Sequence, residues 1–118
     1  MVELEQLRLE LQAYEGPLQE VRDHFDLPGK EKRVEELERK MEEPDFWEDT
    51  EGSQKVMKEL KMLKDTIQTA EELNRQFEDT DTLLEMAEEE EDASLAGEIR
   101  EGIRRLDEHL EEVRISTS

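Results

Sequence analysis

The stretch LEQLRLELQAYEGPLQEVRDHF, residues 4–25, decides the fold, because most of its large apolar residues recur at alternating steps of three and four. This spacing keeps one face of an α-helix against a partner. The positions are Leu4, Leu7, Leu11, Tyr14, Leu18, Val21 and Phe25. Gly16 and Pro17 interrupt the helix, since an interior proline removes a backbone hydrogen bond and clashes with the preceding turn. We therefore expect a kink or a break there, and favour the kink because the apolar seam keeps its phase.

A short second helix is predicted after the turn signal DLPG, residues 26–29, in which an acid, a proline and a glycine stand together. Its apolar stripe consists of Val34, Leu37 and Met41. Pro44 ends this helix, because the residue before a proline is pushed out of the helical region.

A long third helix is predicted from Asp49 and Thr50, which are good capping residues. Its stripe consists of Val56, Leu60, Leu63, Ile67, Ala70, Leu73 and Phe77. It either continues through residues 83–87 or is bent or interrupted at EDTDT, residues 78–82, which is weak helix material. The acidic run at residues 88–94 predicts a solvated turn. The last helix carries Leu95, Ile99, Ile103, Leu106, Leu110 and Val113.

The pattern as a whole predicts an all-α fold, an antiparallel bundle of three to four helices with coiled-coil-like seams. Charged residues make up 44% of the 118 residues and apolar ones 33%, a ratio that suits long helices sharing narrow seams. We expect residues 1–118 to form a single helical domain.

The charge balance argues against nucleic acid or anionic lipid as the default partner. The formal net charge is -20, with 36 acidic against 16 basic side chains, so the chain as a whole repels phosphate. It has no cysteine, which is compatible with a reducing compartment. No apolar run approaches a membrane span, and the first residues lack a signal-peptide pattern. We expect a cytoplasmic protein.

The segment EEPDFWEDTEG, residues 42–52, places Phe46 beside the only tryptophan, Trp47, in a chain with 4% aromatic residues. We interpret Pro44, Phe46 and Trp47 as a structural corner whose two buried rings fasten the chain reversal to the bundle. The alternative is an exposed aromatic hot spot for a partner. The structural interpretation is favoured because nearly every other large apolar residue already fits a seam.

Four lysines at steps of three, Lys55, Lys58, Lys61 and Lys64, follow one side of the third helix. They could contact RNA phosphates locally, although the chain as a whole is acidic. The favoured interpretation is a solvated face neutralised by Glu59 and Asp65, each four residues after a lysine.

We find no pattern typical of catalysis, cofactors or metal. A di-metal bundle needs a Glu-x-x-His spacing, and the residues three before His24 and His109 are Val21 and Leu106. Asp79 and Asp81 lack the glycine and glutamate of a calcium loop. No serine is paired with a base and no glycine-rich loop could cradle phosphate. The sequence predicts neither an enzyme nor a small-molecule substrate.

The segment FDLPGKEKRVEELERKMEEPDFWED, residues 25–49, resembles the N-terminal domain of bacterial class I peptide chain release factors, above all the branch that reads UGA and UAA. The resemblance is most specific at residues 44–47, and residues 83–87 resemble a later segment of the same family. It covers nearly the whole chain.

The resemblance implies a helical domain that positions the factor at the ribosomal stalk base, the GTPase-associated centre, mainly through protein contacts. A second implied partner is the class II release factor GTPase. The family's codon-reading Ser-Pro-Phe type tripeptide and Gly-Gly-Gln loop belong to later domains, and neither motif occurs here. We therefore expect a truncated or isolated domain that cannot terminate translation alone.

Two hypotheses result. The leading one is a translation-termination domain that binds and positions. The other is an acidic coiled-coil scaffold that oligomerises through the same seams. The turns at residues 26–29, 44–49 and 88–94 let the chain fold back on itself, so we expect a monomer.

Overall fold

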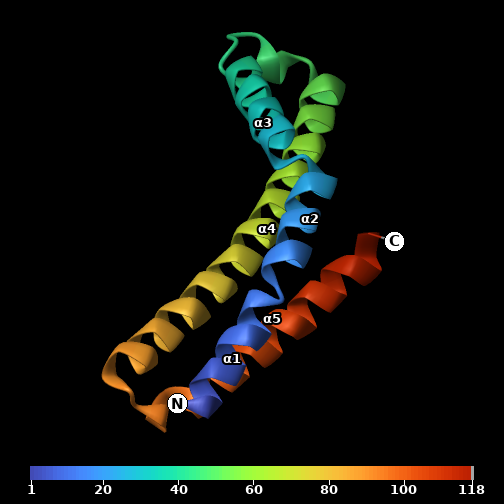
Figure 1. Cartoon of the computed structure of the whole chain (residues 1–118). Coiled ribbons are helices and arrows are strands. Elements are labelled where there is room, and N and C mark those ends of the chain that lie inside the picture. Colours follow the sequence, from blue (N-terminus) through green and yellow to red (C-terminus); the bar gives the residue numbers. More distant parts are fainter. Residues whose placement is uncertain (118) are drawn as a thin grey trace. The chain divides into compact units, whose positions relative to one another are not determined.

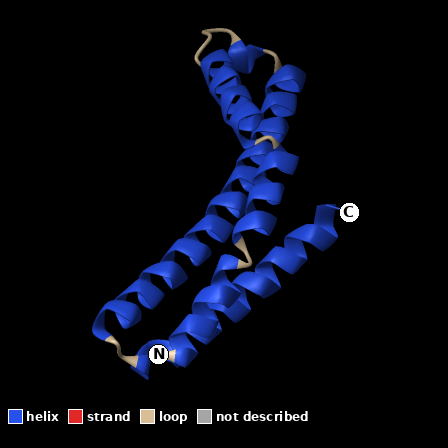
Figure 2. Ribbon diagram, viewed as in Figure 1, coloured by secondary structure: helices blue, strands red, loops and turns tan. Residues whose placement is uncertain are grey.

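The computed structural model describes residues 1–117, with Thr117 described by its backbone alone. Ser118, the last residue of the predicted domain, lies outside the described residues. The elements are α1 (Val2–Gln12), α2 (Glu15–Phe25), α3 (Leu27–Met41), the short 3₁₀ helix η1 (Phe46–Glu48), α4 (Thr50–Glu90), the 3₁₀ helix η2 (Ala93–Leu95) and α5 (Ala96–Thr117). Figure 2 shows only helices and loops in this part of the chain, so the all-α prediction is confirmed. No helix within residues 1–117 is long and apolar enough to cross a membrane.

The fold has two compact units. Unit 1 consists of Met1–Val21 together with the chain from Glu71 onward, and unit 2 is Arg22–Ala70. Helix α4 contributes residues to both units and runs without interruption through residues 78–82. The EDTDT segment therefore does not end or interrupt the third helix. The prediction of a single domain stays a prediction.

In unit 1, α1 packs against α5 in parallel, and the end of α4 runs antiparallel to α5 (Figure 1). The ion pair between Glu3 and Arg100 and the hydrogen bond from Tyr14 to Asp107, at 2.7 Å, set the parallel register. Burial beside this carboxylate raises the pKa of Tyr14 to about 12. The predicted seams form the core, whose buried members include Leu4, Leu7, Leu11, Leu18, Leu73, Leu84, Ile99, Ile103, Leu106, Leu110 and Val113.

The first seam stays in phase across a true break, so the favoured kinked helix is wrong. Residues Ala13 and Tyr14 form a turn, and α2 begins at Glu15 with Pro17 in its first turn. The reason is local: Pro17 has no amide hydrogen for the carbonyl of Ala13, and its ring crowds that carbonyl. The helix instead ends in a tighter turn, in which the Tyr14 amide donates to the carbonyl three residues back, that of Leu11, at 3.0 Å.

In unit 2, α3 and the first part of α4 lie side by side and are joined by the loop that carries η1 (Figure 1). The DLPG signal produces a one-residue turn. Asp26 adopts the left-handed conformation with φ 48°, and its carboxylate caps α3 by accepting from the Gly29 amide. Between the helices, Arg33 binds both carboxylate oxygens of Glu59, at 2.8 and 3.0 Å.

Candidate interaction surfaces

At the corner between α3 and α4, one of the two aromatic rings is buried in the core and the other is exposed to solvent. Phe46 is 7% exposed and packs with Leu37, Val56 and Leu60. Trp47 is 60% exposed, and its ring meets that of Phe46 edge to face at 4.7 Å between centroids. The expectation that both rings are buried is therefore right for Phe46 and wrong for Trp47. Adjacent residues of a tight helical turn point in different directions, so only one ring can face the core.

A capping hydrogen bond holds the backbone where this corner enters α4. The Asp49 carboxylate accepts from the Gly52 amide at 2.9 Å and begins α4, as predicted for a capping residue. A Cβ at position 52 would collide with the Asp49 carboxylate as it now lies, so a larger residue there would make that side chain turn. Helix α3 ends at Met41, and Pro44 lies in the turn that follows. The corner is therefore a turn in which the Asp49 cap fixes the backbone at the start of α4.

A shallow hollow of about 140 Å³ lies at the same corner. Its lining residues are Lys40, Glu43, Asp45, Phe46, Asp49, Gly52 and Ser53. Three carboxylates face one ammonium group there, so the hollow is acidic. Phe46 lines the hollow and also contacts Trp47, which joins the two features into one surface.

The lysine stripe is largely compensated by the fold's own carboxylates. Lys55 pairs with Glu51, Lys61 with Asp65 and Lys64 with Glu38 across to α3. Asp65 is the partner that the sequence predicted, whereas Glu59 binds Arg33 instead of a lysine. The Arg33 hydrogen bonds hold the pKa of Glu59 below its ordinary value. The pairs on the stripe are exposed, and such pairs add little stability.

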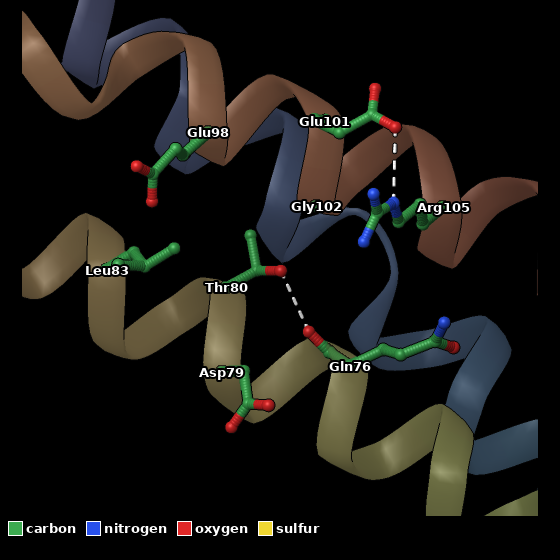
Figure 3. Close-up of a pocket in the computed structure, with 8 residues that line it drawn as sticks. All are labelled: Gln76, Asp79, Thr80, Leu83, Glu98, Glu101, Gly102 and Arg105. Atoms are coloured by element: carbon green, nitrogen blue, oxygen red, sulfur yellow. Dashed lines mark hydrogen bonds and ion pairs between the residues drawn. The ribbon is translucent and has the colours of Figure 1, made fainter.

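A second hollow, of about 360 Å³, lies between α4 and α5 in unit 1 (Figure 3). It is lined by Gln76, Asp79, Thr80, Leu83, Glu98, Glu101, Gly102 and Arg105. Thr80 is buried, its hydroxyl donates to the Gln76 carbonyl at 2.8 Å, and its side chain points at Gly102. Any Cβ at Gly102 would collide with Thr80, so this glycine lets the two helices approach. This hollow was not predicted from the sequence, although a glycine inside a helical seam is the signal for it.

Both histidines have neighbours within their own unit. His109 Nδ1 lies 2.7 Å from the side-chain oxygen of Gln76, and the ring of His24 packs edge to face on Phe25. Within residues 1–117, no three His, Asp or Glu side chains are grouped as metal ligands would be.

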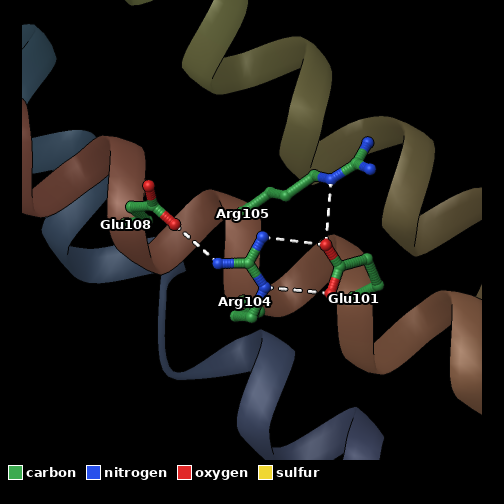
Figure 4. Close-up of polar contacts among 4 residues, drawn as sticks. All are labelled: Glu101, Arg104, Arg105 and Glu108. Atoms are coloured by element: carbon green, nitrogen blue, oxygen red, sulfur yellow. Dashed lines mark hydrogen bonds and ion pairs between the residues drawn. The ribbon is translucent and has the colours of Figure 1, made fainter.

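Glu101, Arg104, Arg105 and Glu108 of α5 form an exposed cluster of arginine and glutamate side chains, with Arg105 extending toward α4 (Figure 4). Arg104 donates to both oxygens of Glu101, at 2.8 and 2.9 Å, and to Glu108 at 2.6 Å. Arg105 also donates to Glu101, at 3.2 Å. These bonds, led by those from Arg104, lower the pKa of Glu101 to about 2.

Replacing Arg104 by alanine is expected to raise the pKa of Glu101 from about 2 toward the ordinary value of 4.5. Because the folded-state pKa is depressed, whatever stability this carboxylate adds is present above pH 4.5 and lost as the pH falls toward 2. Carboxyl-carbon NMR titration measures the shift. Arg100→Ala is the matched control, since Arg100 pairs with Glu3. An unchanged Glu101 pKa in Arg104→Ala would contradict the assignment.

Comparison with known protein families identifies the chain. The model of the PCRF domain matches residues 30–118, which is most of the sequence. The chain belongs to the PCRF domain family. The matched part includes all of the α3 to α4 corner and both hollows, so the candidate surfaces belong to the PCRF domain itself. The family resemblance noted in the sequence is thereby confirmed.

Relatives of this PCRF domain are named as release factors. It is 35% identical to peptide chain release factor 2 of Exiguobacterium sp. over 97% of this chain and 31% of that protein. It is 34% identical to peptide chain release factor 2 of Clostridium perfringens, over 99% of this chain and 32% of that protein. It is 38% identical to peptide chain release factor RF2 of Thermus thermophilus, over 71% of this chain and 22% of that protein. The chain spans about a third or less of these relatives.

Proposed function

We propose that this PCRF domain is the N-terminal helical domain of a peptide chain release factor and acts in translation termination. One observation carries the proposal: nearly the whole chain aligns with proteins named peptide chain release factor 2. The domain's part is to bind the large ribosomal subunit at the stalk base, the GTPase-associated centre, and so to position the factor. Codon reading and release of the peptide are assigned to the part of the factor beyond this domain.

The geometry of the domain supports a role in binding. The buried hydrophobic residues pack between the helices of each unit, and the exposed surface is dominated by charged side chains, of which some are held in ion pairs. An exposed aromatic side chain on a turn whose backbone is capped suits a role in binding. The proposal gives this domain no chemical step.

The proposal is tested by sedimentation of the purified chain with isolated ribosomal subunits. We expect the chain to sediment with the 50S subunit and to remain in the supernatant with the 30S subunit. Absence of 50S binding by the unaltered chain would overturn the proposed function.

The lysine stripe is tested in the same assay with the double variant Lys55→Glu and Lys58→Glu. We expect binding to the 50S subunit to stay within twofold of the unaltered chain, because acidic neighbours already compensate most of the stripe. Both positions are exposed, so the variant keeps its fold, which circular dichroism checks. A clear loss of binding would make the stripe a ribosome contact.

A further inference from the structure

Trp47 is the feature that the fold leaves unexplained. It carries the largest apolar side chain in the sequence, yet it is 60% exposed, while every residue of the predicted seams is buried or half-buried. A monomeric fold gains little from a tryptophan in water, and tryptophan is enriched where one protein anchors another.

The indole is held in place before any partner arrives. Its ring leans edge to face on Phe46, which is itself fixed in the core of unit 2 by Leu37 and Leu60. The Asp49 cap on Gly52 fixes the backbone on the other side of the turn. A side chain that is already ordered loses little conformational entropy on binding, so the corner is suited to act as an anchor.

The charge around Trp47 selects the chemistry of the partner. The exposed acidic residues of the corner are Glu42, Glu43, Asp45, Glu48 and Asp49. Within residues 1–117 none of their carboxylates forms a salt bridge, and among these carboxylates only that of Asp49 accepts a hydrogen bond, from the Gly52 amide. Uncompensated carboxylates attract lysine and arginine and repel phosphate.

The hollow beside Phe46 offers a seat for such a side chain. Glu43, Asp45 and Asp49 line it together with a single lysine, Lys40, so its net charge is negative, and its volume of about 140 Å³ is open to solvent. Trp47 does not line the hollow, but its ring contacts Phe46, which does, and the exposed indole can accept an aliphatic chain or, by cation–π contact, a guanidinium group.

We propose that Trp47 and the acidic hollow form a docking surface for a basic protein segment, which packs on the indole and places a lysine or arginine among the carboxylates. The proposal rests on the proposed function, because it places that segment on a protein of the large ribosomal subunit. RNA is disfavoured as the occupant, since its phosphates would approach the same carboxylates.

Cross-linking identifies the class of the occupant. The full chain carrying p-benzoylphenylalanine in place of Trp47 is irradiated with 50S subunits. We expect a discrete adduct that survives ribonuclease and whose partner, by mass spectrometry, is a basic protein. The same group in place of Met62, which is 66% exposed on α4, is the control and should give no such adduct. A ribonuclease-sensitive adduct, or no adduct at position 47, overturns the proposal.

Affinity for the 50S subunit tests the energetic role. Trp47→Ala, and separately the double variant Glu43→Lys with Asp45→Lys, are each expected to raise the Kd about tenfold. Met62→Ala should stay within twofold. Circular dichroism confirms that each variant is folded. If the unaltered chain binds and Trp47→Ala changes the Kd less than threefold, the docking surface is wrong while the proposed function stands; if the unaltered chain does not bind, the proposed function itself fails.

Discussion

Replacing Phe46 by alanine is expected to lower the free energy of unfolding by about 3–5 kcal/mol, because the ring fills the core between α3 and α4. Phe46 contacts Leu37, Val56 and Leu60 there, and deleting it leaves a cavity that the cap at the start of α4 hinders from closing. A loss of this size is a large share of the stability of a small domain.

The neighbouring residue provides the matched comparison. Trp47→Ala removes a larger ring but only an exposed one, so we expect a cost of about 1 kcal/mol, the worth of its edge-to-face contact. Urea denaturation followed by circular dichroism measures both variants. Equal losses for Phe46→Ala and Trp47→Ala would show that the corner buries both rings and that the division between core and solvent is wrong.

Replacing Leu106 by alanine is expected to cost about 2–5 kcal/mol, since this side chain is 0% exposed at the centre of the α5 seam. The same substitution at Leu9, which is 68% exposed on α1, should change the stability by less than about 0.5 kcal/mol. The two variants differ only in burial, because both replace a leucine within a helix of unit 1. Denaturant midpoints compare them directly, and a small loss at Leu106 would place the core of unit 1 elsewhere.

The helices could be read from the sequence because a seam is a local pattern. Spacing alone predicts that Leu4, Leu7, Leu11, Ile99 and Ile103 are buried, and each of them is. The capping role of Asp49 was readable for the same reason, since a cap involves residues only three positions apart.

The errors arose where spacing carries no information. A tight turn such as η1 has no period, so nothing in the sequence says which of Phe46 and Trp47 faces inward. Glu59 pairs with Arg33 on another helix, although Lys55 stands four residues away on its own helix, because helix packing decides between equivalent exposed partners. The close approach at Gly102 likewise depends on which residue of α4 lies opposite.

The division of α4 between the two units has a consequence for the order of folding. Unit 2 pairs segments that are neighbours along the chain, so little loop-closure entropy opposes it. Unit 1 instead joins the first residues to the last, with residues 22–70 as an insertion between its parts. Contacts of such long sequence separation form slowly unless the intervening chain is already ordered. We infer that unit 2 can nucleate early, whereas unit 1 is completed only when α1 packs against α5.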